Sequence, residues 1–130
     1  ADPDNRSVGL GAGEFIDRYV FPDGELPHVS LAIRELSEAG LELTDAESLR
    51  RHYAKTLGFW SDSFERQIDH LTALAGEKRT RIWRVYLAGC AHAFAHGWIN
   101  IYQLQAIRPR NGAGGAESPL PLSRAYMYAD

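Results

Sequence analysis

The chain of 130 residues contains a single cysteine, Cys90, so no internal disulfide can form. Cys90 lies in the run LAGCAHAF, and small apolar neighbours of this kind are typical of a buried thiol. No stretch approaches the ~20 apolar residues that span a bilayer, and the first residues show no signal-peptide pattern. These absences favour a cytoplasmic protein and leave peripheral membrane contact open.

The chain also lacks an excess of positive charge. Its 14 Lys and Arg residues against 17 Asp and Glu give a formal net charge of −3, which argues against a dedicated nucleic-acid binder. The basic residues nevertheless form two clusters, Arg50 with Arg51, and Lys78, Arg79, Arg81 with Arg84. Such clusters are usually a solvated helix face, and the alternative is contact with phosphate headgroups.

Self-contained catalytic motifs are missing as well. The segment GLGAGE fails as a nucleotide-binding loop, because no strand pattern precedes it and Glu14 takes the place of the third glycine. His92 and His96 are four residues apart, as zinc ligands on a helix would be. No glutamate lies between them and no third ligand is evident, so no metal site is expected.

Hydrophobic periodicity predicts a mainly helical chain. The segment FIDRYVF breaks at a turn, Pro22-Asp23-Gly24, and a short helix then opens at Pro27 and is stopped by Gly40. A capping-box pattern at residues 44–47 predicts the start of a long helix, in which Gly58 would cause a kink or break. A further helix is expected from about Glu77 to Ala95, with Gly97 as its stop.

Two segments read as strands, LELT at residues 41–44 and INIYQLQAIR at 99–108. A sheet of two strands is marginal alone, and a strand that is apolar on both faces needs covered neighbours. The chain therefore reads as the end of a larger α/β fold. With strand 99–108 uncovered, the chain is expected to associate with itself.

Tyr53 raises a question about function. It lies on an apolar stripe with the three- and four-residue spacing of one helix face, Leu49, Tyr53, Leu57, Trp60, Phe64, Ile68 and Leu71. A leucine would fit such a face without a penalty, whereas a buried phenol needs a hydrogen-bond partner. The hydroxyl therefore either bonds to the backbone of the fold or holds a ligand.

Three segments, in this order, resemble the C-terminal third of cyclopropane-fatty-acyl-phospholipid synthases and the related mycolic acid cyclopropane synthases. They are FIDRYVFPDGELPHVS, LRRHYAKTLGFWSDSFER and RIWRVYLAGCAHAFAHGWINIYQLQ, and the resemblance covers about residues 15–106. It implies the C-terminal portion of a Rossmann-like class I methyltransferase fold, with mostly helices and two or three strands. On this basis residues 1–14 are a flexible lead-in, 15–108 belong to the methyltransferase domain, and 109–130 are a linker and docking tail.

The resemblance also implies an activity. Enzymes of this family transfer the methyl group of S-adenosylmethionine to the double bond of an unsaturated acyl chain, and loss of a proton then closes a ring or leads to another methylated product. Tyr53, in HYAKTL, matches the tyrosine that helps hold a bicarbonate ion as general base. Leu57, Tyr86, Cys90 and Phe94 would line the acyl channel, although such residues at helical spacing also suit an ordinary core.

The same comparison implies what this chain lacks. The glycine-rich S-adenosylmethionine loop and the other bicarbonate contacts have no counterpart here, so the chain alone is expected to be inactive and to bind no cofactor. Expected partners are phospholipid acyl chains at the inner membrane face. Two alternatives are a small-molecule amine methyltransferase that shares this C-terminal pattern and a stand-alone helical lipid-binding module.

Overall fold

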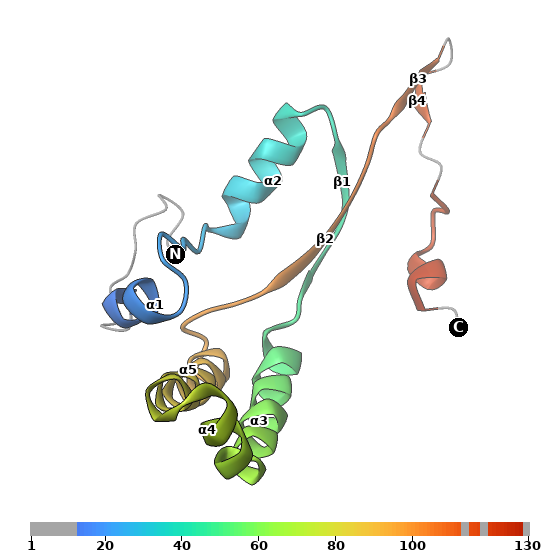
Figure 1. Ribbon diagram of the computed structural model, residues 1–130. Helices are drawn as coiled ribbons and strands as arrows, with labels where there is room; N and C mark the ends of the chain where they lie inside the picture. Colours follow the sequence, from blue (N-terminus) through green and yellow to red (C-terminus); the bar gives the residue numbers. More distant parts are fainter. Residues whose placement is uncertain (1–12, 113–114, 118–119, 129–130) are drawn as a thin grey trace.

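The computed structural model describes residues 13–112, 115–117 and 120–128 of the chain (Figure 1). The elements, in chain order, are α1 (Gly13–Tyr19), α2 (Val29–Glu38), β1 (Glu42–Ser48), α3 (Arg50–Arg66), α4 (Ile68–Ala75), α5 (Glu77–Ala95), β2 (Tyr102–Ile107), β3 (Arg110–Gly112), β4 (Gly115–Glu117) and the 3₁₀ helix η1 (Arg124–Tyr128). The predicted mixture of several helices and a few strands is therefore confirmed.

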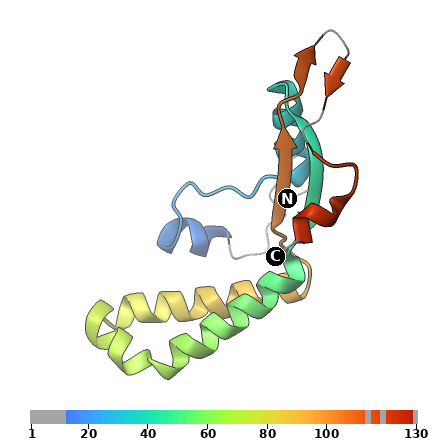
Figure 2. The same cartoon turned by 90° about the vertical axis from the view of Figure 1, so that its right-hand side faces the viewer.

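An antiparallel helical hairpin of α3 and α5, with α4 at its tip, projects from the rest of the molecule (Figure 2). Its centre is formed by Leu57, Leu87 and Phe94, which are 3%, 8% and 7% exposed. Half-buried apolar residues of both helices and of the segment after α5 pack around them. The predicted stripe of α3 thus faces a core, although Trp60 within it is exposed.

A two-stranded antiparallel ribbon of β1 and β2 forms the base of this hairpin. The pairing runs from Glu42 opposite Ile107 to Ser48 opposite Tyr102, with a register shift between Leu43 and Asp45. The amide of Leu49 then donates to the carbonyl of Ile101 at 2.9 Å. The ribbon therefore holds the start of α3 beside the segment that follows α5.

The predicted short helix is confirmed as α2, which begins after His28. The Nδ1 atom of His28 accepts from the amide of Ser30 at 3.2 Å, and Gly40 follows the helix with a φ of 77°. The expected turn is also present, since the amide of Gly24 donates to the carbonyl of Phe21 at 3.1 Å. Helix α1 includes residues 13 and 14 of the expected lead-in, and residues 1–12 lie outside the described ones.

Two local predictions are wrong. The capping-box residues 44–47 belong to strand β1, where the Thr44 hydroxyl donates to the carbonyl of Gln105 at 3.2 Å, and α3 starts only at Arg50. Pairing with β2, some sixty residues away, satisfies these backbone groups better than a helix start would. Gly58 causes no break either, because α3 is continuous to Arg66 and the chain turns at Gln67.

The C-terminal tail packs on the ribbon. Arg124 of η1 forms an ion pair with Asp45, whose side chain is only 10% exposed, and the Tyr126 hydroxyl donates to Oε1 of Gln105 at 2.8 Å. Thr44 also donates to this Gln105 oxygen. The segment expected as a linker contains the short antiparallel pair β3–β4.

Candidate functional site

Tyr53 lies in the first turns of α3, at the base of the hairpin. Its ring is 5.1 Å from that of Phe94 and 6.2 Å, nearly edge-on, from that of Trp60. The side chain is half-buried, and within the described residues its hydroxyl forms no hydrogen bond. No polar side-chain atom in this part of the chain is both fully buried and unpaired, so the hydroxyl is accessible. Tyr53 therefore presents a free donor at the edge of an apolar cluster.

The four residues predicted to line an acyl channel meet between α3 and α5. Leu57 and Phe94 are buried, and Tyr86 and Cys90 pack against them from α5. Tyr53 joins the same cluster. The structure thus brings together all the residues that the sequence singled out for the site.

The polar groups of this cluster are held in their neutral forms. The pKa of Tyr86 is raised to about 12, chiefly because burial disfavours the phenolate and secondly because of the neighbouring Cys90. Burial likewise raises the pKa of the Cys90 thiol, and contact with Tyr86 offsets only part of this effect. At neutral pH the cluster therefore carries a phenol and a thiol without charge, as an apolar ligand requires.

Arg50 has a structural role that the sequence did not reveal. Its Nη1 atom donates to the carbonyls of Phe94 at 2.9 Å and Ala95 at 3.3 Å, at the end of α5. A cation at a helix C-terminus satisfies free carbonyls and opposes the helix dipole favourably. Arg50 thus fixes the end of α5 that carries Phe94, and it is not free to meet a headgroup.

The second basic cluster is divided. Nε and Nη2 of Arg84 donate to the two carboxylate oxygens of Glu65 at 2.6 and 2.7 Å, which joins α5 to α3. Lys78, Arg79 and Arg81 form no ion pair within the described residues and are exposed. Of the six basic residues noted in the sequence, Arg50 and Arg84 therefore serve the fold, and the other four remain on the surface.

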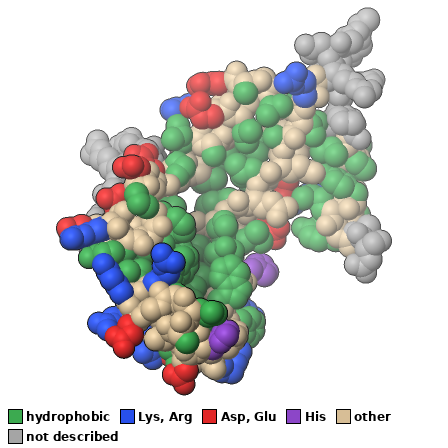
Figure 3. All heavy atoms as spheres, in the orientation of Figure 1, with side chains coloured by type: hydrophobic (Ala, Val, Ile, Leu, Met, Phe, Trp, Pro, Cys, Tyr) green, Lys and Arg blue, Asp and Glu red, His purple; other side chains and the backbone are tan. Residues whose placement is uncertain are grey.

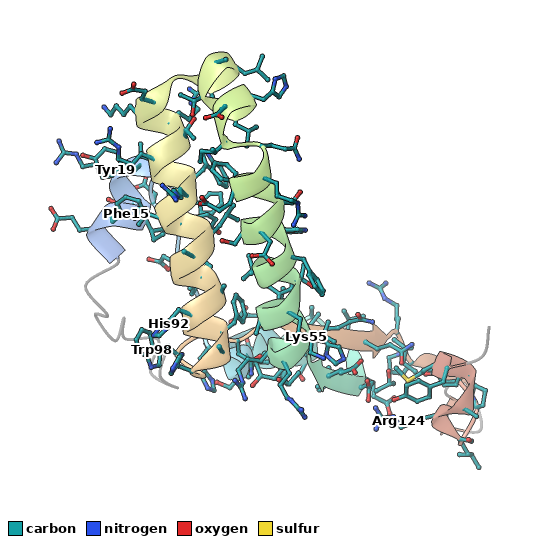
Figure 4. The ribbon with its side chains drawn as sticks, turned by 90° about the horizontal axis from the view of Figure 1, so that it is seen from below. Phe15, Tyr19, Lys55, His92, Trp98 and Arg124 are labelled. Carbon is teal, nitrogen blue, oxygen red and sulfur yellow. The ribbon has the colours of Figure 1, made fainter. Side chains whose placement is uncertain are left out.

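His92 and His96 pack against each other and against Trp98 at the end of α5. The rings of His92 and His96 stack with their centroids 3.9 Å apart, and His92 also meets Trp98 edge-on (Figure 4). In the described ranges, no three His, Cys, Asp or Glu side chains are grouped to hold a metal ion. Within the same ranges, no helix combines the length and apolar character that a membrane span needs.

Solved structures identify the class of fold. The cyclopropane synthase MmaA2 from Mycobacterium tuberculosis matches with a TM-score of 0.70 and 30% identity, over 72% of this chain and 33% of its own. The mycolic acid cyclopropane synthase CmaA1, in complex with SAH and CTAB, matches with a TM-score of 0.69 and 34% identity over the same shares. The predicted fold class is therefore confirmed: the chain is a portion of an α/β methyltransferase fold.

Sequence comparison then identifies the family. The model of the mycolic acid cyclopropane synthetase family matches residues 2–104. A probable fatty acid methyltransferase from Pseudomonas putida is 56% identical over 125 residues, which are 96% of this chain and 31% of that relative. The chain belongs to the mycolic acid cyclopropane synthetase family, as its three motifs predicted. It spans about a third of the length of this relative.

Proposed function

We propose that this chain is part of an S-adenosylmethionine-dependent methyltransferase that modifies unsaturated acyl chains of phospholipids. The observation that carries the proposal is the family match over residues 2–104. The names of relatives agree with it, since one is a probable fatty acid methyltransferase and another was solved with SAH, the demethylated form of the cofactor. No residue of this chain is assigned to the cofactor, so the chain alone is inactive in this proposal.

The α3–α5 hairpin supplies the apolar wall of the site. Methyl transfer to an alkene leaves a positive charge on a carbon atom of the acyl chain, and water must be kept away from it. Leu57 and Phe94 exclude water, and the faces of the Phe94 and Tyr86 rings favour a nearby cation. The neutral Cys90 adds a small polarisable group without charge. These residues suit an acyl channel because none of them would trap the cation as an anionic nucleophile.

Tyr53 fits the role of an anion holder. Its hydroxyl has no partner among the described residues, although the ring is anchored against Phe94. A bicarbonate ion bound there would supply the base that takes the proton lost after methyl transfer. Tyr53 would donate its O–H to one oxygen of that ion, and the remaining donors would come from parts of the protein beyond this chain. A charge-assisted bond of this kind keeps the ion close to the developing cation.

Tyr53→Phe tests this role in the full-length protein. It removes the donor and leaves the ring in place, so kcat should fall roughly 10- to 100-fold, as expected for losing one hydrogen bond to a charged group. Stimulation by added bicarbonate should weaken in the same variant. The control is Tyr126→Phe, which removes a phenol hydroxyl from the tail, away from Tyr53. Equal activity of wild type and Tyr53→Phe would show that Tyr53 has only a structural role.

A further inference from the structure

Helix α1 lies beside the first half of α5, and two open hollows of about 340 and 510 Å³ lie between them. Figure 4 shows Phe15 and Tyr19 on α1 next to α5. Tyr19 and Ile82 line both hollows, with Val85 in the first and Trp83 in the second. Tyr19, Trp83 and Val85 are 42%, 39% and 54% exposed. This side of the molecule therefore presents aromatic and aliphatic groups to solvent.

The rim of these hollows is basic. Lys78 lines both, Arg81 lines the first, and Arg18 and Arg79 line the second, against a single carboxylate, Glu77. Figure 3 shows Lys and Arg side chains gathered over this region. Arg18 lies 5.3 Å and Lys78 5.9 Å from the centre of the Tyr19 ring. In a chain of net charge −3, this is a local concentration of positive charge.

We propose that this basic-aromatic face, made of Arg18, Tyr19, Lys78, Arg79, Arg81 and Trp83, docks on the surface of an anionic phospholipid bilayer. The inference rests on the proposed function for the identity of the substrate. Basic side chains attract anionic headgroups, and Trp and Tyr rings favour the boundary between headgroups and acyl chains.

The face is continuous with the predicted acyl channel. Trp83 contacts Tyr86 edge-on, with ring centroids 5.3 Å apart, and Phe21 contacts the same ring at 5.8 Å. Tyr86 in turn packs against the cluster of Leu57 and Phe94. Trp83, Tyr86 and this cluster therefore form an unbroken series of aromatic and apolar side chains from the face to the interior of the hairpin. Docking at this face would place the substrate at the entrance to the site.

Vesicle binding of the full-length protein tests the charge of the face. Sedimentation with phosphatidylcholine vesicles, with and without about a third phosphatidylglycerol, should show binding only to the anionic ones. The triple variant Lys78→Gln, Arg79→Gln, Arg81→Gln should bind on the order of 100-fold more weakly. Its control removes three exposed cations of α3, Arg51→Gln, Lys55→Gln and Arg66→Gln, and should bind like wild type. Absence of vesicle binding, or equal losses in both triple variants, would overturn the proposal.

The aromatic part of the face needs a separate variant. Trp83→Ala should weaken vesicle binding roughly 10-fold, because a partly exposed indole no longer enters the interface. Trp98→Ala is its control, since Trp98 is also exposed but lies beyond the other end of α5. Equal effects of the two substitutions would contradict insertion at Trp83.

Activity measurements separate this inference from the proposed function. The Lys78, Arg79 and Arg81 triple variant should lose turnover of lipid in vesicles and keep turnover of lipid dispersed in detergent. Loss of both activities to the same extent would count against a docking role. If wild type binds anionic vesicles but methylates no lipid in either form, the proposed function fails and the docking surface stands.

Discussion

At the scale of single residues, the clearest feature is the Tyr86–Cys90 pair in the interior of the hairpin. Burial raises the pKa of both groups, and the pKa of Tyr86 reaches about 12. The folded state therefore holds the Tyr86 proton more tightly than the unfolded chain does. A group of this kind stabilises the fold at low pH and loses that contribution as the pH rises.

Stability should accordingly fall with rising pH in a defined window. Below the ordinary pKa of 10.0 the contribution of Tyr86 is complete, and it is lost as the pH rises toward about 12. Tyr86→Phe has no proton to lose, so its free energy of unfolding should decline less than that of wild type over this range. Urea unfolding at several pH values measures the difference, with the exposed Tyr128→Phe as control. Parallel curves for wild type and Tyr86→Phe would contradict a buried phenol.

At the scale of secondary-structure elements, the hairpin depends on contacts that join its two ends. The ribbon positions the start of α3, and Arg50 reaches from that start to the carbonyls at the end of α5. Gly97 follows that end with a φ of 74°, close to the Arg50 guanidinium. These contacts hold Tyr53 on α3 opposite Phe94 on α5, so the geometry of the candidate site follows from them.

Removing the Arg50 cap should therefore destabilise the hairpin. Arg50→Gln is expected to lower the free energy of unfolding by about 1–3 kcal/mol, because the charged donor to the carbonyls of Phe94 and Ala95 is lost. The neighbouring Arg51→Gln, which changes an exposed side chain, should have an effect within about 0.5 kcal/mol. Urea unfolding monitored by circular dichroism measures both. Equal stabilities of the two variants would show that the cap is unimportant.

At the scale of the whole molecule, the chain exposes more surface than a compact protein of its mass. Its accessible surface is 10039 Å², whereas a compact monomer of 14.5 kDa would expose about 6,900 Å². The ribbon is two-stranded, and Tyr102 on β2 is 41% exposed. Phe59, Trp60 and Leu74 are exposed on the hairpin as well. This surface is suited to contact with other parts of a larger protein or with a second copy of the chain.

The isolated chain should therefore associate with itself. Exposed apolar groups and the free edge of β2 favour contacts between copies, because both are otherwise left to water. Sedimentation velocity over a range of concentrations should show an increase in average mass. A monomer at every concentration would contradict this expectation.

Much of the local structure followed from the sequence. The periodicity of α5 predicted its bounds at about Glu77 and Ala95. Gly40, the predicted stop of the short helix, lies directly after α2 and its C-cap. Strand β2 falls within the predicted segment 99–108. The residues of the candidate site followed from the family resemblance, and spacing alone placed Tyr53 only on an apolar helix face. For the helices, the deciding interactions are between residues close in sequence.

Other features depended on residues far apart in the chain. The capping-box pattern at Thr44 predicted a helix start, but this segment pairs with β2 instead. The chain also turns between α3 and α4 at Gln67, where no glycine or proline indicates a turn. The sequence predicted Arg50 on a solvated helix face, whereas the fold brings the end of α5 beside it. The meeting of α1 with α5, which creates the basic-aromatic face, has no local signal either.

By itself the sequence determined the family, the positions of most helices and the residue types of the candidate site. These follow from motifs and from the spacing of apolar side chains along a helix. Only the tertiary structure decided that the Tyr53 hydroxyl lacks a partner in the described part of the chain, that Arg50 caps α5, and which cations remain free. The reason is physical: whether a polar group is satisfied depends on what the fold brings within hydrogen-bond distance, and distant segments set that distance.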